Sequence, residues 1–159
     1  MKIKSIFVCI ASIAILFAAC EGPEGDPGTA NVIYSDWSVL DGQWRDSTFS
    51  LANYKVNHLD APALTQDILD GGVVLCYSRY LGNIVTLPYT CISYKLTFHP
   101  NLSRILFTTL KNDLSGGVAL SSNYYFRYVL IPGGIPAQFA LDYTKLSYED
   151  LCSELNIPE

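Results

Sequence analysis

The chain has 159 residues, a formal net charge of −5 and a charged-residue content of 16%. Lysine and arginine form no cluster, so the sequence lacks the concentrated positive charge that neutralises nucleic-acid phosphates or anionic lipid headgroups. Eleven tyrosines and the low charge favour a β-rich exported domain instead.

Residues 1–19 are predicted to be a lipoprotein signal peptide. Lys2 and Lys4 precede an apolar run over residues 6–19, which is shorter than the ~20 residues that a membrane-spanning helix needs. The stretch Leu16-Phe-Ala-Ala-Cys20 resembles the lipobox of bacterial lipoproteins. This resemblance implies cleavage before Cys20, a diacylglyceryl group on its thiol and acylation of the new amine. Because the leucine stands one place early, an ordinary secretory cleavage is the alternative.

Residues 20–30, which begin with the lipidated Cys20, are predicted to form a Gly/Pro-rich spacer. Glycine recurs at every third position from residue 22 to 28, with Pro23 and Pro27 between. A collagen triple helix needs many triplets and three chains, so an extended, stiff spacer is expected. Residues 31–159 then form one domain. Without the signal peptide, the mature chain has a net charge of about −7.

From residue 31 onward, apolar and polar residues alternate in short runs that are bounded by turn-forming residues, as in half-buried strands. Ile33 and Trp37 are expected on one face of the first strand. Residues 73–80 are apolar on both faces, which predicts a central strand covered on both sides. The predicted strands are 31–39, 48–58, 73–80, 84–89, 92–99, 104–110, a short one at 118–120, and 124–131.

Two short helices are predicted beside these strands. Thr65 is a candidate N-cap for a helix that links two strands, and Gly71 is a candidate C′ residue, just beyond the end of that helix. Ser147 is the candidate N-cap of a C-terminal helix, in which Leu151 and Leu155 would dock on a sheet. The fold class is therefore all-β: an antiparallel β-sandwich of about seven strands with one linking helix and a short C-terminal helix.

Three cysteines remain outside the signal and the anchor: Cys76, Cys91 and Cys152. Cys76 and Cys91 lie on neighbouring predicted strands and form a candidate disulfide for an oxidising compartment. Three buried free thiols are the alternative. An odd number of cysteines leaves at least one thiol free or paired between chains.

No catalytic residue, metal site or cofactor is predicted. The two histidines, His58 and His99, lie near strand ends, and nothing in the sequence brings them together with carboxylates. Nucleophile-elbow, Walker A, dinucleotide-binding and zinc-protease motifs do not occur in the sequence. An envelope hydrolase remains a hypothesis that requires one histidine beside a carboxylate or a serine in a concave site.

The tyrosines are the one group of residues in the sequence that suggests a ligand. Tyr80, Tyr89 and Tyr125 are candidates for stacking against ligand rings, because aromatic platforms on β-sandwiches commonly bind sugars. The alternative is that the aromatic residues fill the core and line its rim. The binding hypothesis requires two or more exposed aromatic rings that lie coplanar on one face.

Several segments also resemble a known family. The segments are GTANVIYSDW (28–37), APALTQDILD (61–70), LPY (87–89), YVLIPGG (128–134) and NIPE (156–159). Together with the lipobox and the glycine triplets, they resemble small Bacteroidetes-type lipoproteins that carry a collagen-like spacer and a β-rich domain. No activity is established for that family, so the resemblance implies only localisation and a single domain.

The sequence therefore predicts an outer-membrane lipoprotein on the periplasmic or cell-surface side, with a non-catalytic structural or interaction role. Its expected partners are the membrane, through N-terminal acyl chains, and an envelope protein or a glycan; nucleic acid is not an expected partner. The alternative function is a glycan-binding module on the cell surface.

Overall fold

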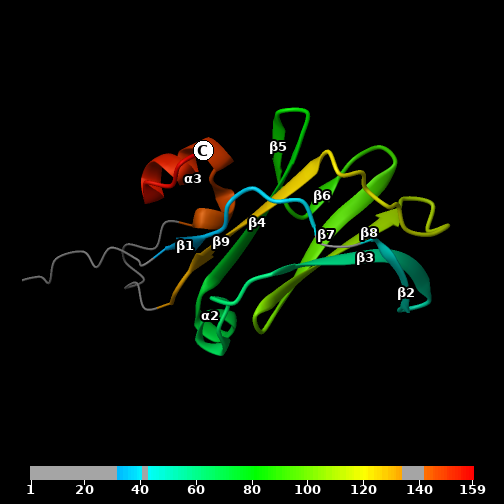
Figure 1. Ribbon diagram of the computed structural model, residues 1–159, viewed down its shortest axis with the longest axis horizontal. Coiled ribbons are helices and arrows are strands. Elements are labelled where there is room, and N and C mark those ends of the chain that lie inside the picture. Colours follow the sequence, from blue (N-terminus) through cyan, green and yellow to red (C-terminus); the bar gives the residue numbers. More distant parts are fainter. Residues whose placement is uncertain (1–31, 41–42, 134–141) are drawn as a thin grey trace, which may run out of the picture.

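The computed structural model describes residues 32–40, 43–133 and 142–159. In this part of the chain, nine strands form two antiparallel sheets that pack face to face (Figure 1). The predicted all-β, sandwich-like fold is confirmed.

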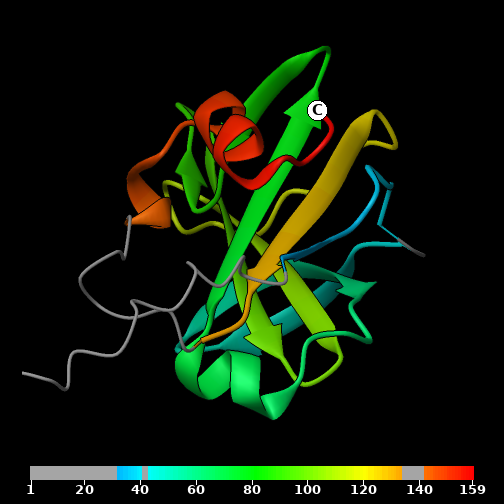
Figure 2. The same cartoon turned by 90° about the vertical axis from the view of Figure 1, so that its left-hand side faces the viewer.

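Sheet A has the strand order β1-β9-β4-β5. Alternate residues of β4 and β9 point to two different cores, one shared with the second sheet and one shared with the C-terminal helix α3 (Tyr148–Leu155) (Figure 2). Cys76 and Phe126 lie on the inner face, and Tyr77 and Val129 lie on the outer face. The predicted central, doubly covered strand is confirmed, because both of its faces are buried. The strands are β1 (Ile33–Tyr34), β9 (Tyr124–Ile131), β4 (Val73–Tyr80) and β5 (Asn83–Thr86).

Sheet B has the strand order β2-β3-β8-β7-β6. Its inner face supplies Leu96, Ile105 and Phe107 to the core between the sheets. The ring of Phe107 meets that of Phe126 of sheet A, with 4.7 Å between the centroids. The strands are β2 (Arg45–Phe49), β3 (Ala52–Asp60), β8 (Arg104–Lys111), β7 (Tyr94–Asn101) and β6 (Tyr89–Thr90).

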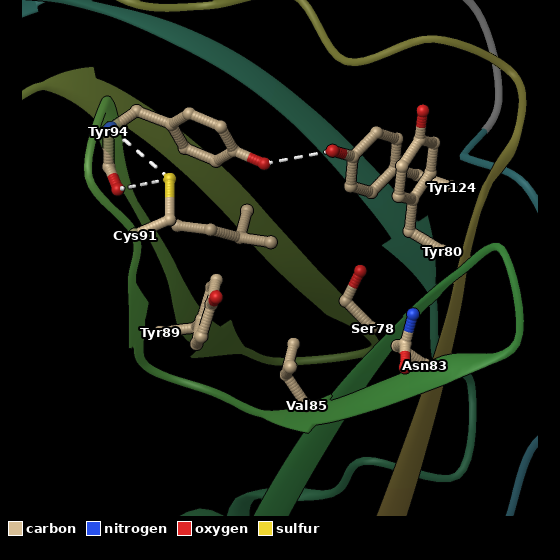
Figure 3. Close-up of a pocket in the computed structure, with 9 residues that line it drawn as sticks. Ser78, Tyr80, Asn83, Val85, Tyr89, Cys91, Tyr94 and Tyr124 are labelled. Atoms are coloured by element: carbon tan, nitrogen blue, oxygen red, sulfur yellow. Dashed lines mark hydrogen bonds between the residues drawn. The ribbon is translucent and has the colours of Figure 1, made fainter.

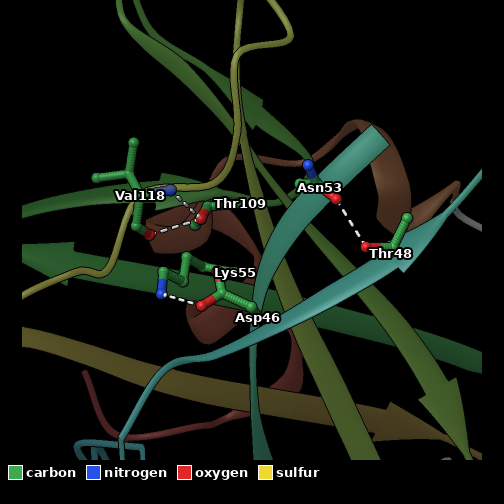
Figure 4. Close-up of polar contacts among 6 residues, drawn as sticks. All are labelled: Asp46, Thr48, Asn53, Lys55, Thr109 and Val118. Atoms are coloured by element: carbon green, nitrogen blue, oxygen red, sulfur yellow. Dashed lines mark hydrogen bonds and ion pairs between the residues drawn. The ribbon is translucent and has the colours of Figure 1, made fainter. Parts of the chain in front are cut away.

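The strand predicted at 48–58 is instead parts of two strands of a hairpin. β2 and β3 are joined at Ser50 and Leu51, which have φ angles of 50° and 64°. Two successive positive φ values fit the tight turns that match the twist of a hairpin. Ser-Leu is not a usual sequence for such a turn, so the sequence did not reveal it. The Lys55 Nζ–Asp46 Oδ2 pair, at 2.9 Å, crosses this hairpin (Figure 4).

The strand predicted at 118–120 does not form. The backbone N–H of Val118 donates to Thr109 Oγ1 at 2.9 Å, and Thr109 Oγ1 donates to the Val118 carbonyl at 2.6 Å (Figure 4). The Thr109 side chain therefore makes both hydrogen bonds that the backbone of a neighbouring strand would otherwise make with Val118. Gly117 packs so closely on β3 that a Cβ atom there would lie 1.9 Å from the backbone nitrogen of Lys55.

The first predicted strand is interrupted by a bulge. Tyr34 pairs with Val129, but the next bridge joins Ser38 to Phe126, so the N-terminal segment contains one extra residue. Ser35 fills the gap, because its Oγ accepts the Tyr128 N–H at 3.1 Å. A one-residue slip reverses the alternation of side chains. Ile33 and Trp37 consequently pack in different cores, and the prediction that they share a face is wrong.

Both predicted helices are present. In α2 (Gln66–Gly71) the Thr65 side chain accepts a hydrogen bond from the Ile68 N–H, as predicted. Gly71 is the last helical residue and Gly72 is the C-cap, so Gly71 is not the C′ residue that the sequence predicts. A short 3-10 helix (Tyr143–Lys145) precedes α3 (Tyr148–Leu155), which Ser147 caps as predicted. Leu151 is fully buried against sheet A, so α3 closes the outer face of that sheet.

Candidate ligand pocket

A cavity of about 360 Å³ opens between the two sheets at one end of the sandwich (Figure 3). Strands β4, β5 and β9 supply one side of it, and β6, β7 and the turn before β7 supply the other. None of its lining residues has a charged side chain. We call it the tyrosine pocket, and its lining residues are Ser78, Tyr80, Asn83, Val85, Tyr89, Cys91, Tyr94, Leu96 and Tyr124.

Strand register explains why these residues meet. Tyr80 and Tyr124 are cross-strand partners on the inner face of sheet A, and Ser78 lies opposite Val85. Tyr89 is likewise paired with Leu96 on the inner face of sheet B. Because side chains on one face repeat every second residue, these inner-face positions converge at the open end of the sandwich.

Three of the tyrosines hold one another in place. The rings of Tyr80 and Tyr124 are stacked, with centroids 4.3 Å apart and planes inclined by 16°. The hydroxyls of Tyr124 and Tyr94 lie 3.1 Å apart and form a hydrogen bond between the two sheets. Burial, and secondarily this hydrogen bond to Tyr124, raises the pKa of Tyr94, so its hydroxyl stays protonated. These two contacts tie the Tyr80, Tyr94 and Tyr124 side chains together across the two sheets.

Ser78 places a polar group with no partner inside the pocket. Its side chain is almost fully buried, with 2% of the residue exposed, and its hydroxyl points into the cavity (Figure 3). This hydroxyl makes no hydrogen bond to any residue in the described ranges. Among the described residues, the one enclosed side-chain polar atom without a partner is Trp37 Nε1, so the Ser78 hydroxyl is reached through the cavity rather than sealed in the protein. A ligand or a water in the cavity can therefore hydrogen-bond to it.

Two of the three predicted stacking residues reach the pocket. Tyr80 and Tyr89 line it and are 38% and 37% exposed. Tyr125 is equally exposed, at 39%, but it lies on the outer face of β9, 5.2 Å from the Arg79 guanidinium. Side chains alternate between the two faces of β9, so neighbouring Tyr124 and Tyr125 must lie on opposite faces, and this spacing is visible in the sequence. Ser78 carried no comparable signal, because its role depends on a cavity between two sheets.

The structure has no disulfide between Cys76 and Cys91: both of them, and Cys152, are free thiols. Cys76 lies in the core on the inner face of β4, where burial raises its pKa. Cys91 lies before β7 instead, and its thiol donates to the Tyr94 carbonyl at 3.3 Å. Cys91 is half-buried and lines the pocket, whereas Cys76 and Cys152 are buried.

The two histidines lie on the outer face of sheet B, on either side of Leu106. Two strand spacings separate them, about 10 Å between Cα atoms. His58 Nε2 is 3.9 Å from Asp60 Oδ1, and His99 Nε2 is 3.4 Å from Thr108 Oγ1. The shallow cavity beside His99 is lined by neither a carboxylate nor a serine. Within the described residues, no group of three or more His, Cys, Asp or Glu is placed to hold a metal ion.

On the outer face of sheet A, Arg127 is buried with 2% of the residue exposed. Its Nε donates to the Ser35 carbonyl at 2.8 Å, and its Nη1 donates to the Pro158 carbonyl at 2.6 Å and to the Tyr148 hydroxyl. The guanidinium also lies 5.0 Å from the centroid of the Tyr34 ring. One side chain therefore joins the N-terminal segment, α3 and the C-terminal tail to β9.

Cys20, the predicted signal peptide and the predicted spacer lie outside the described residues. Among the helices that the structure does describe, none has the length and hydropathy to cross a bilayer. No protein-family model matches the sequence, and neither a curated protein nor a solved structure matches it. The resemblance to Bacteroidetes-type lipoproteins therefore stays a prediction.

Proposed function

We propose that the protein is a lipid-anchored, non-catalytic binding protein of the bacterial outer membrane, held by acyl chains on Cys20. Its sandwich binds a ligand of the envelope in the tyrosine pocket. The lipobox and the spacer support the anchor, and the pocket supports the binding role.

The observation that carries this proposal is the position of the pocket relative to the N-terminus. The chain enters the domain at Ile33, which pairs with Leu130 near the end of β9. Tyr124 and its partner Tyr80 lie at the opposite end of the same strands. Six residues of strand separate Tyr124 from Leu130, about 20 Å. A tether at the N-terminus would therefore leave the pocket on the far end of the sheet, open to ligands.

The pocket supports binding rather than catalysis. Its lining is uncharged, and none of the nine lining residues is a histidine, an aspartate or a glutamate. These are the side chains that most often carry out general acid–base chemistry. An apolar cavity with a few placed polar groups is the usual form of a small-ligand site.

Membrane fractionation tests the anchor. The wild-type protein, expressed in a Gram-negative host, is expected in the membrane pellet after a carbonate wash and in solution only after detergent. Cys20→Ser is expected in the soluble fraction, because one or more acyl chains are lost. Cys91→Ser is the matched control and should remain in the pellet. Wild-type protein that washes off in carbonate, with an unmodified thiol on Cys20, contradicts the proposal.

The alkylation rate of Cys91 tests occupancy of the pocket. Its thiol lines the cavity, whereas Cys76 and Cys152 are buried, so peptide mass spectrometry reads Cys91 separately. Small molecules extracted from the host envelope are expected to slow alkylation of Cys91 in the wild type and not in Tyr89→Ala. An equal rate with and without extract counts against a ligand in this pocket.

A further inference from the structure

The tyrosine pocket combines apolar ring surfaces with free hydrogen-bonding capacity. Figure 3 shows Tyr89 on one side and the stacked Tyr80–Tyr124 pair on the other, with Ser78 between them. Tyr89 is 37% exposed, and in the described part of the chain no aromatic ring or guanidinium is recorded against its ring. Asn83, at the same rim, is exposed and adds an amide.

From this arrangement we infer that the pocket binds a neutral saccharide of one or two pyranose rings. The inference rests on the proposed binding function and names the ligand class. A pyranose has an apolar C–H face that packs on an aromatic ring and hydroxyls around its edge that hydrogen-bond. Tyr89 supplies the ring for the apolar face, and the Ser78 hydroxyl and the Asn83 amide lie where the hydroxyls would reach.

A charged ligand does not fit this lining. Transfer of an ionised group from water into a cavity without a counter-charge costs several kcal/mol, because its hydration is lost. The nine lining residues include no lysine, arginine, aspartate or glutamate. Acidic saccharides and phosphorylated ligands are therefore disfavoured relative to their neutral counterparts.

A wholly apolar ligand, such as a fatty acyl chain, does not fit either. It would cover the Ser78 hydroxyl, which lines the cavity and is open to water in the empty pocket, without giving it a hydrogen-bond partner. Covering a hydroxyl in this way costs the hydrogen bonds that it made with water. A saccharide hydroxyl removes this cost, because it both donates and accepts hydrogen bonds.

The size of the cavity limits the length of the ligand. Small-ligand sites usually measure ~300–1,000 Å³, and the tyrosine pocket, at about 360 Å³, lies at the lower end. Tyr80 and Tyr124 stand at the ends of β4 and β9, near the open end of the sandwich, and the buried residues Ser78 and Leu96 close the cavity on the side of the core. The pocket therefore receives the end of a saccharide chain rather than a long segment lying along the surface.

Calorimetric titration of the lipidated protein in detergent tests the inference. The probes are neutral hexoses, N-acetylhexosamines and their disaccharides, with uronic acids and laurate for comparison. Neutral saccharides are expected to bind, whereas uronic acids and laurate do not. Tyr89→Ala is expected to weaken binding by ~10-fold or more, and Ser78→Ala by about 5- to 30-fold, as the loss of a buried hydrogen bond implies.

Tyr125→Ala is the matched control, because Tyr125 has the same residue type and almost the same exposure as Tyr89 but faces away from the pocket. The affinity of the Tyr125→Ala variant for neutral saccharides should stay within about twofold of the wild-type affinity, as expected for a residue outside the site. Binding of laurate or uronic acids through Tyr89, or an equal loss in Tyr125→Ala, overturns the saccharide inference. If no saccharide binds but envelope extract still protects Cys91, the inference fails and the proposed binding function survives. If neither occurs, both fail.

Discussion

The two faces of sheet A contrast sharply, although the same strands build both. On the outer face, Arg127 directs its donors to two carbonyls and a tyrosine hydroxyl, and α3 covers the surrounding residues. At the open end of the inner face, Ser78 is almost as deeply buried, yet its hydroxyl has no partner among the described residues.

This difference separates a structural site from the proposed binding site. A buried polar group that is fully hydrogen-bonded contributes to the stability and uniqueness of the fold. A buried polar group that lines a cavity without a partner contributes little to stability, and a ligand can satisfy it. We therefore expect substitutions on the outer face to change the free energy of unfolding, and substitutions in the tyrosine pocket to change affinity.

The largest effect is expected from Arg127→Met. The substitution keeps much of the side-chain volume but leaves the Ser35 and Pro158 carbonyls and the Tyr148 hydroxyl without their donor. Each unsatisfied group costs about 1–3 kcal/mol, so the unfolding free energy should fall by about 3 kcal/mol or more. Urea denaturation measures it.

Arg79→Met is the matched control on the same face. Arg79 is half-buried, and its described contacts are the faces of the Trp37 and Tyr125 rings. Two cation–π contacts at a partly exposed site predict a loss of about 1–2 kcal/mol. If Arg127→Met and Arg79→Met lowered the free energy of unfolding equally, the hydrogen bonds of Arg127 would not be the cause of its larger predicted effect.

A smaller effect is expected at alkaline pH. Burial is the main cause that raises the pKa of Tyr77 on the outer face and of Tyr94 in the pocket. Above the unfolded-state pKa of ~10, the unfolded chain loses protons that the folded chain retains. Stability should therefore be unaffected by these groups below about pH 10 and then fall by up to about 1.4 kcal/mol per pH unit for each tyrosine.

Tyr77→Phe and Tyr94→Phe should each make this alkaline decline less steep. Chemical denaturation at several pH values between 8 and 11 measures the slope. A slope that is unchanged in both variants would show that neither phenol is more protonated in the folded state than in the unfolded state.

The smallest change in stability is expected for Ser78→Ala. The hydroxyl has no partner to lose, so the free energy of unfolding should change by less than about 0.5 kcal/mol. Thr109→Val is the contrasting variant, because Thr109 exchanges two hydrogen bonds with Val118. The free energy of unfolding of Thr109→Val should be about 1–3 kcal/mol lower than that of the wild type. A loss for Ser78→Ala as large as that for Thr109→Val would mean that Ser78 has a structural role.

Alternation and capping made much of the fold predictable. Strands β4 and β9 have the predicted bounds, and the Thr65 and Ser147 caps form as expected, because each depends on local sequence. The bulge at Ser35 was not predictable, because it depends on the side chain of Ser35 bonding to a strand that is distant in the sequence.

The candidate site was predictable only in part. Tyr80 and Tyr89 were identifiable as aromatic residues at the ends of strands, and both line the pocket. Tyr125 lies outside the pocket, since residue spacing on β9 places it on the opposite face from Tyr124. Ser78 was not identifiable, because an unpartnered hydroxyl is a property of the packed sandwich rather than of the local sequence.

Backbone amide NMR shifts of the protein, recorded with and without small molecules from envelope extract, test the contrast between the two faces most directly. Shifts are expected to change around Ser78, Tyr80 and Tyr89, and to stay unchanged around Arg127 and Tyr148. Changes centred on Arg127 and Tyr148, or no changes at all, would contradict the assignment of the tyrosine pocket as the binding site.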